Sequence, residues 1–139
     1  MPRLKKYTTT QMQKKLWKTF SKFIRLRDCL ATTKTPEYGI CFTCGRQFPI
    51  KELQAGHFIS RRFKALLFDE MNVNSQCSFC NCFRGGQPEE YFVRMEQKYG
   101  RDMVNDLLKR KHEIKKWSVA ELEYLVQLYE NMIEDLSTS

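Results

Sequence analysis

The stretch NVNSQCSFCNCFRGG, residues 72–86, decides how this chain folds. It contains the pair Cys77 and Cys80 in Cys-x-x-Cys spacing, and a second pair with this spacing, Cys41 and Cys44, lies upstream. A Cys-x-x-Cys turn directs two thiolates at one point, so two such turns complete a tetrahedral zinc site. The spacing therefore predicts one structural zinc ion bound by the four cysteines.

Two further cysteines, Cys29 and Cys82, are left over, and we interpret both as small, semi-buried residues. Cys82 remains an alternative to Cys80 as a ligand if the second turn is built differently. Four thiolates leave no open position on the ion, so the zinc is expected to hold the fold and not to catalyse. No apolar leader follows Met1, and we expect a reducing, cytoplasmic protein without disulfides.

The formal net charge of +8 is concentrated in the first 27 residues, which hold nine Lys or Arg and no acidic residue. A basic arm of this kind usually meets DNA or RNA, although a solvated helix face is the simpler alternative. We expect DNA contacts from the arm, from a basic loop and from the end of the 72–86 stretch: Lys14, Lys18, Lys22, Arg25, Arg61, Arg62, Lys64 and Arg84. The chain's second histidine, His112, is interpreted as part of another basic surface.

The length of 139 residues suits one domain with a modest core, and no apolar run approaches the roughly 20 residues that span a membrane. We expect an α+β protein that is mostly helical. Its parts are a basic N-terminal helix and linker (1–36), a zinc-bound core (37–87) and C-terminal helices (88–139).

Apolar periodicity, capping residues and turn residues predict the elements within these parts. Helices are expected from the threonines at 8–10 to about residue 30, from Pro88 to Gly100, over 102–111, and after a capping box at 118–121 to about residue 136. Strands are expected over 53–58 and 73–76, with a surface loop over 59–70. Residues 32–39 are expected to form a linker and 48–50 a turn.

Chemically distinctive residues follow a fixed order along the chain: the first Cys-x-x-Cys pair, His57, Asn72, and the second pair with Asn81 directly after it. This order resembles the HNH, or ββα-metal, nucleases that carry a zinc ion. The resemblance extends over most of the chain to the phage recombination endonucleases of the Rap (NinG) type. It includes the segments Phe23-Ile24-Arg25, Ala55-Gly56-His57, Phe68-Asp69-Glu70-Met71-Asn72, Gln76-Cys77, Tyr91 and Trp117-Ser118.

The resemblance implies a role for each of these polar residues. His57 would be the general base that deprotonates the attacking water. Asn72, with Asn74 as the alternative, would orient the site by bonding backbone across the hairpin. Asn81 would offer its carbonyl oxygen to a catalytic Mg²⁺ or Mn²⁺ ion, and Arg84 would clamp a phosphate.

One position departs from the pattern of the resembled family. Many HNH enzymes have an aspartate directly before the catalytic histidine as a second metal ligand, and here that residue is Gly56. Asp69 or Glu70 could contribute instead, but the sequence does not place either residue at the site. The catalytic ion is therefore expected to bind weakly until DNA supplies further oxygens.

The function implied is metal-dependent hydrolysis of DNA, on branched recombination intermediates such as Holliday junctions and D-loops. Two alternatives remain open: a homing-type or nicking endonuclease on duplex DNA, and a zinc-ribbon module that binds DNA without cutting it. Two symmetric incisions in a junction would require two active sites, so a homodimer is a further expectation. The apolar face of the last helix would form its interface, or be buried within the monomer.

Overall fold

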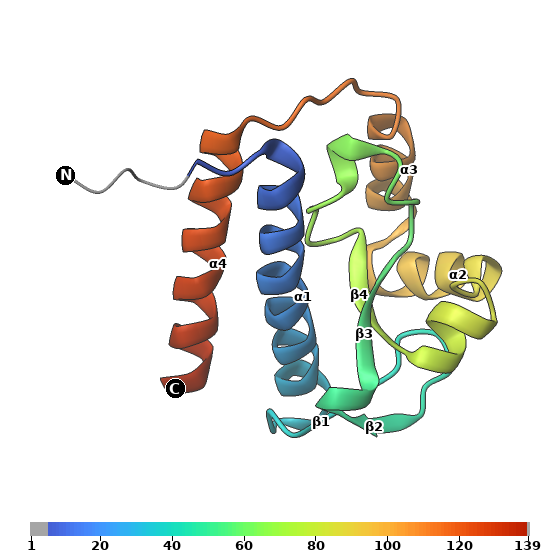
Figure 1. Cartoon of the computed structure of the whole chain (residues 1–139). Coiled ribbons are helices and arrows are strands. Elements are labelled where there is room, and N and C mark those ends of the chain that lie inside the picture. The colour runs from blue at the N-terminus through green and yellow to red at the C-terminus, as the bar shows by residue number, and fades with distance from the viewer. Residues whose placement is uncertain (1–5, 139) are drawn as a thin grey trace.

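A computed structural model describes residues 6–138, and it has a mixed α+β architecture that is mostly helical (Figure 1). Helix α1 (Thr9–Thr33) lies in the middle. Helix α4 (Val119–Thr138) packs on one side of it and runs in the same direction, while the hairpin of β3 (Leu53–His57) and β4 (Val73–Cys77) packs on the other. No helix within 6–138 is both long and apolar enough to cross a membrane.

Helix α1 begins with a capping box, in which the Thr8 hydroxyl accepts from the backbone of Gln11 and the Gln11 side chain accepts from the backbone of Thr8. It ends at Lys34, whose φ of 63° stops the helix. The predicted helix is confirmed, and it continues one turn beyond the predicted end at residue 30. Its apolar face contributes five residues to the main core: Met12, Leu16, Phe20, Phe23 and Ile24.

The same core takes side chains from the hairpin, from the loop after β3 and from α4. Phe20 of α1 meets Tyr129 of α4 edge-on, with ring centroids 4.9 Å apart. The apolar face of α4 is thus buried within the monomer, which was one of the two alternatives expected for this helix. The remaining members of the core are Ala55, Leu67, Phe68, Val73, Leu122 and Val126.

A second, smaller hairpin was not predicted. Strands β1 (Tyr38–Ile40) and β2 (Gln47–Pro49) pair antiparallel and carry the first cysteine pair in the turn between them. We expected a linker over 32–39 and a turn over 48–50. Both predictions were wrong where these ranges overlap β1 and β2. Strands of three residues, one of them ending in proline, are too short to show alternation in the sequence.

Strands β3 and β4 pair antiparallel with Gly56 opposite Asn74 and His57 opposite Val73, which confirms both predicted strands. The loop between them is only partly a surface loop. Its cationic residues are exposed, but the chain turns inward at the end of the short helix η2 (Lys64–Leu66), where three consecutive apolar side chains are buried: Leu66, Leu67 and Phe68.

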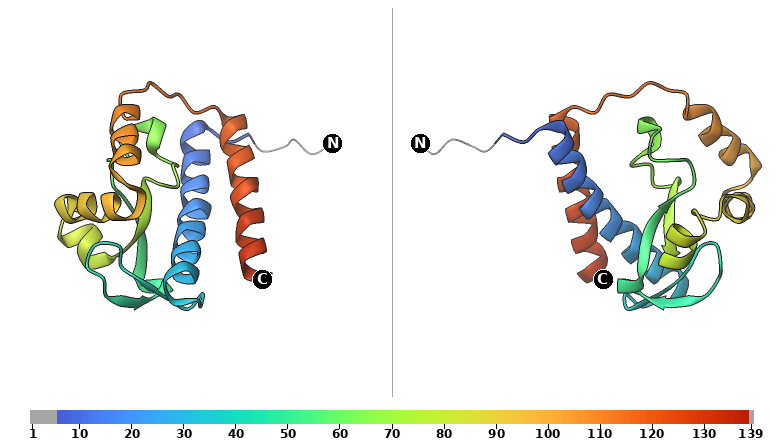
Figure 2. Two further views of the ribbon diagram at one scale, coloured as in Figure 1. Left: turned by 180° about the vertical axis from the view of Figure 1, so that it is seen from behind. Right: turned by 45° about the vertical axis from the view of Figure 1, so that its right-hand side comes forward.

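A single π turn, η3 (Phe79–Phe83), follows β4, and helices α2 (Pro88–Tyr99) and α3 (Arg101–Arg110) then cover the far side of the hairpin (Figure 2). Pro88 begins α2 and Gly100 ends it, as predicted. These helices and the loop after β3 enclose a second core cluster: Ile59, Leu66, Tyr91, Met95, Val104 and Leu107.

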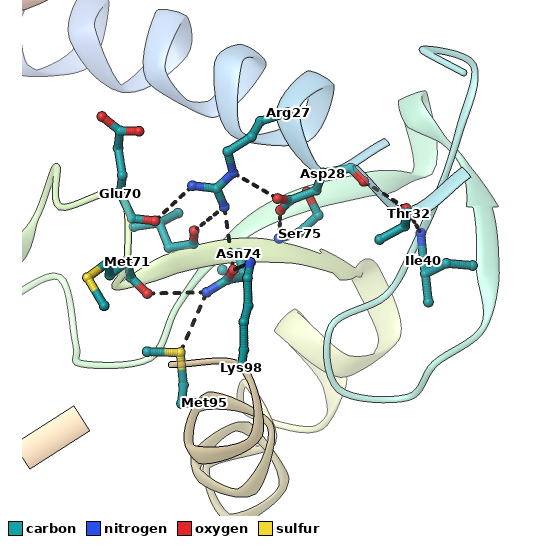
Figure 3. Close-up of polar contacts among 12 residues, drawn as sticks. Arg27, Asp28, Thr32, Ile40, Glu70, Met71, Asn74, Ser75, Met95 and Lys98 are labelled. Carbon is teal, nitrogen blue, oxygen red and sulfur yellow. Dashed lines mark hydrogen bonds and ion pairs between the residues drawn. The ribbon is translucent and has the colours of Figure 1, made fainter. Parts of the chain in front are cut away.

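Helix α1 closes the outer edge of β4 with two charged side chains (Figure 3). Asp28 accepts a hydrogen bond from the backbone N–H of Ser75 at 2.8 Å, and Arg27 donates to the carbonyl oxygen of Val73 at 3.0 Å. The two side chains are also paired with each other at 2.8 Å. Polar backbone groups that a two-stranded sheet would leave open are thus satisfied by the helix.

Asn74 continues this network towards α2 (Figure 3). Its side-chain N–H₂ group donates to the hydroxyl of Tyr91 at 3.2 Å, and its carbonyl oxygen accepts from Lys98 at 3.2 Å. The Tyr91 hydroxyl in turn donates to the carbonyl oxygen of Gly56 at 2.8 Å. Asn74 therefore links the hairpin to the surrounding helices.

Replacing Asp28 should test the importance of this edge. Asp28→Ala leaves the largely buried guanidinium of Arg27 without its counter-charge and the N–H of Ser75 without its acceptor. We expect a loss of about 3 kcal/mol in the free energy of unfolding, measured by urea denaturation in zinc-containing buffer. As control, Arg94→Gln removes an exposed ion pair with Glu90 and should change stability by less than about 0.5 kcal/mol. If the two substitutions lowered the stability equally, the Asp28–Arg27 pair would not be what stabilises the edge of β4.

Candidate functional site: a four-cysteine cluster beside a histidine cleft

The sulfur atoms of Cys41, Cys44, Cys77 and Cys80 lie within 4.8 Å of one another. Tetrahedral coordination at a Zn–S distance of about 2.3 Å places the sulfurs about 3.8 Å apart, and Cys44 and Cys77 are 3.9 Å apart. The cluster could therefore hold a metal ion such as zinc. It joins the β1–β2 turn to the end of β4.

The local backbone shapes both turns for this purpose. The N–H of Cys44 points at the sulfur of Cys41 at 3.5 Å, and the N–H of Cys80 points at the sulfur of Cys77 at 3.4 Å. Gly45 follows the first turn with a φ of +74°, which favours glycine. N–H groups directed at sulfur stabilise thiolates, the form that binds metal.

Neither leftover cysteine joins the cluster. Cys82 is exposed and its sulfur lies 3.3 Å from the side-chain oxygen of Gln54, so Cys80 and not Cys82 completes the group. Cys29 is fully buried in α1 against Gly39, and burial raises its pKa to about 11. Cys29 is therefore an inert packing residue.

A cleft of about 670 Å³ opens between α1, β3 and the segment that follows η3. His57 and Asn81, the proposed base and metal ligand, both line it. Arg25 from α1 and Arg61 from the loop after β3 line it as well. The structure thus brings together four of the residues singled out from the sequence.

His57 is held in this cleft by two contacts. Its ring stacks on Trp17 of α1, with centroids 4.8 Å apart and planes inclined by 19°. Its Nε2 atom lies 3.0 Å from the carbonyl oxygen of Leu67. A carbonyl can only accept, so Nε2 carries the proton and Nδ1 of the neutral ring is the nitrogen that can take one up.

Burial lowers the pKa of His57 below its ordinary value of 6.5, and the charge of Arg61 lowers it further, against an opposing effect of the Leu67 hydrogen bond. The imidazole is therefore neutral at neutral pH. A neutral imidazole is the form that a general base requires.

Asn72 fixes the loop that carries the Leu67 carbonyl. It is fully buried, accepts from the backbone N–H of Ile59 at 2.7 Å, and donates to the carbonyl oxygens of Ile59 and Leu66, each at 3.0 Å. Asn72 thus bonds the backbone on both sides of this loop, and its role in positioning a catalytic site stays a prediction. The alternative, Asn74, belongs instead to the network between β4 and α2.

Asn81 presents its carbonyl oxygen towards β3. Its N–H₂ group donates to Gln54 at 2.8 Å, and its Oδ1 lies 3.0 Å from the point where a β-carbon on Gly56 would stand. An amide oxygen in a polar cleft fits a hard divalent cation such as Mg²⁺ or Mn²⁺. Asp69 and Glu70 do not line the cleft; Asp69 pairs with Arg110 and Glu70 with Tyr129.

The structure does not bring Arg84 into this cleft. Its guanidinium lies over the ring of Phe79, 5.2 Å from the centroid, beside the cysteine cluster. Phe79 and Phe83 form an aromatic pair with centroids 6.2 Å apart, and they are 54% and 82% exposed. A cation and two exposed aromatic rings thus flank Asn81 in the sequence.

The other predicted DNA-binding residues are exposed, except Arg25, which is half-buried. Trp17, Ser21 and Arg25 recur every four residues and line it along α1. The exposed side chains of Lys14, Lys18 and Lys22 share this spacing and form a neighbouring stripe on the helix, and those of Arg61, Arg62 and Lys64 lie on the loop after β3.

Sequence reasoning missed two residues of the site. Trp17 follows the apolar period of its helix, which predicts packing against the core, and nothing in that period indicates that it stacks on His57. Gln54, which orients Asn81, carries no motif. Strand alternation does place it on the same face of β3 as Gly56, and this was the one available signal.

Removing a cluster cysteine tests the metal site. We expect one zinc ion per wild-type chain, and we expect Cys77→Ser to lose it and unfold, because metal binding contributes to folding in small domains. Cys82→Ser is the matched control and should retain both zinc and melting temperature, since its sulfur lies outside the cluster. Metal content by mass spectrometry and thermal melting give the answer. A wild-type chain that contains no metal, and whose melting temperature does not change when zinc is added, would refute the metal site.

The family model described as the bacteriophage lambda NinG protein matches residues 3–138. Among curated relatives, Protein ninG of Escherichia phage 933W is 28% identical over 100 residues, which cover 71% of this chain and 49% of the relative. Protein ninG of Salmonella phage P22 and of Escherichia phage lambda are 27% and 26% identical over the same length, which covers 71% of this chain and 48% of each relative.

The chain therefore spans about half the length of the curated relatives it matches. No solved structure is significantly similar to it. Since the family model extends over nearly every residue, the comparison is decisive at the level of the family: this chain belongs to the NinG family of bacteriophage proteins.

Proposed function

We propose that this protein is a divalent-metal-dependent DNA endonuclease of the HNH type, in which β3, β4 and η3 form the ββα-metal core. The observation that supports this best is the placement of His57 and Asn81 in one cleft with two arginines. A pure binding module would have no use for a histidine whose pKa is lowered and whose Nδ1 is left to accept a proton.

In this proposal His57 removes a proton from the attacking water. Leu67 and the stacked ring of Trp17 fix the imidazole, so Nδ1 accepts the proton without a change of tautomer. Asn72 supports this arrangement by holding the adjacent carbonyl of Leu66. The resulting imidazolium keeps its Nε2–H bond to the Leu67 carbonyl, which stabilises the charge.

Asn81 would hold a Mg²⁺ or Mn²⁺ ion through its side-chain oxygen. When bound, the ion would neutralise charge on the scissile phosphate and stabilise the leaving oxygen. Arg25 and Arg61 would contact phosphates on either side within the cleft, and the lysine stripe of α1 would follow the DNA backbone away from it.

We further propose branched DNA as the substrate, with recombination intermediates such as Holliday junctions and D-loops as examples. The chain's resemblance to phage recombination endonucleases supports this. The exposed pair of Phe79 and Phe83, with Arg84 over one ring, adds a physical reason, because aromatic faces stack on bases that are not fully paired. Paired incisions in a four-way junction would call for a homodimer.

The His57→Ala variant tests catalysis. We expect nicking of supercoiled plasmid in Mg²⁺ to fall at least about a hundredfold, because the base is gone, while zinc content and DNA affinity stay near the wild-type values. His112→Ala is the matched control, since it removes the other, exposed histidine, and it should cut normally. Unchanged cutting by His57→Ala would overturn the assignment.

The same assay can separate the candidate substrates. Faster cleavage of a four-way junction than of a linear duplex with equal sequence supports the branched-DNA proposal. Equal rates indicate a nicking enzyme for duplex DNA, and binding without any Mg²⁺-dependent cleavage indicates a zinc-ribbon module.

The pH dependence of cleavage provides an independent test. His57 must be neutral to act, and its pKa lies below 6.5, so activity should persist as the pH falls through 6.5 and be lost only below that value. Arg61→Gln removes a charge that lowers this pKa, so it should move the acid limb of the rate profile to higher pH. The profile is measured as single-turnover rate against pH. An acid limb clearly above 6.5 in the wild type would contradict the base assignment.

A further inference from the structure

Gln76 lies on β4, and its amide orientation is fixed by two acceptors. Its Nε2 donates to the hydroxyl of Thr43 at 3.0 Å and to the carbonyl oxygen of Gly86 at 2.9 Å. The Gly86 carbonyl can only accept, so the nitrogen must face it and Oε1 must face the opposite way. Gly86 itself lines the cleft, which places Gln76 directly behind the cleft wall.

The Oε1 atom of Gln76 is buried and has no hydrogen-bond partner among the described residues. A buried amide oxygen without a partner costs about 1–3 kcal/mol, so native proteins rarely leave one unless a ligand uses it. The side chain is 0% exposed, so bulk water does not satisfy this oxygen. It is a polar atom held in place without an evident structural purpose.

This oxygen converges with that of Asn81 on one point next to Gly56. A β-carbon built on Gly56 would stand 1.9 Å from the Gln76 oxygen and 3.0 Å from the Asn81 oxygen. Two amide oxygens from different elements, β4 and η3, therefore lie close together beside the residue that precedes His57. Neutral oxygens that converge in this way repel each other, and a cation between them removes the repulsion.

We propose that Gln76 is a second protein ligand of the divalent ion, acting through Oε1 together with Oδ1 of Asn81. The proposal rests on the proposed function, because it places this ion in the nuclease cleft. Both ligands are hard oxygens, as Mg²⁺ and Mn²⁺ prefer, and neither is charged. The ion would therefore bind weakly to the protein alone and more tightly once phosphate oxygens complete its coordination.

The same geometry explains why residue 56 is glycine. Any β-carbon there would overlap the Gln76 oxygen at 1.9 Å, far inside contact distance. Position 56 and Gln76 thus compete for one space, and the amide oxygen occupies it in this chain.

Direct Mn²⁺ titration of the zinc-loaded chain, without DNA and followed by the electron paramagnetic resonance signal of free Mn²⁺, tests the proposal. Gln76→Met keeps the length of the side chain and removes the oxygen, so it should weaken Mn²⁺ binding about tenfold. Ser75→Ala is the matched control. Ser75 is the neighbouring residue, also buried with an unpartnered oxygen, but it faces the opposite side of β4 and should leave Mn²⁺ affinity unchanged.

A rescue variant guards against simple misfolding. In Gly56→Asp/Gln76→Ala the aspartate enters the space that the shortened side chain vacates, so Mn²⁺ affinity should return to at least the wild-type value. Gly56→Asp alone should not gain affinity, because Gln76 still fills that space. If Gln76 has a purely structural role, Gln76→Met should lower the melting temperature and leave the Mn²⁺ affinity of the folded protein at the wild-type value.

The outcomes separate this inference from the proposed function. If Gln76→Met binds Mn²⁺ as tightly as the wild type while Asn81→Ala loses it, Gln76 is not a ligand and the endonuclease proposal stands. If the wild type cuts DNA, but neither Gln76→Met nor Asn81→Ala weakens its Mn²⁺ binding, the proposed ion site between these two residues is wrong. If it neither binds Mn²⁺ nor cuts DNA in Mg²⁺, both proposals fail together.

Discussion

The paired charges of Arg27 and Asp28 against the open edge of β4 are the constraint on which the rest of the structure depends. A two-stranded hairpin has little stability by itself in water. Helix α1 supplies hydrogen bonds to one edge, and its preceding residues Trp17 and Arg25 line the cleft. Fixing the strand to the helix therefore also fixes the distance between the histidine and the cationic side chains that surround it.

The cysteine cluster provides the second fixed point, at the other end of β4. It holds the start of η3, so Asn81 is positioned by the turn that contains a cluster ligand. Between the two fixed points Gln76 is paired with Gln54, and its side chain reaches diagonally across the hairpin to Gly56. Polar groups in this region are positioned by hydrogen bonds among neutral side chains and backbone carbonyl groups. That arrangement suits chemistry in which a phosphate and an ion bring most of the charge.

Sequence reasoning predicted the parts of the molecule that local rules determine. The four long helices, the β3–β4 hairpin and the choice of cysteines follow from periodicity, capping and ligand spacing, and the structure confirms them. The β1–β2 hairpin and the buried segment after Lys64 were missed, because their pairing and burial depend on neighbours distant in the chain. Trp17 and Gln54 were missed for the same reason: Trp17 meets His57 only after the hairpin has packed on α1, and Gln54 meets Asn81 only after η3 has folded back beside β3.

The parallel packing of α1 against α4 has a consequence for biosynthesis (Figure 1). Helix α1 ends at Thr33 and α4 begins only at Val119, so the part of the α1 surface that α4 covers stays open while the intervening residues are made. Long sequence separation between packing partners also slows folding. A chain truncated before residue 119 would leave uncovered the part of α1 that packs against Leu122, Val126 and Tyr129, and this apolar surface would bind chaperones.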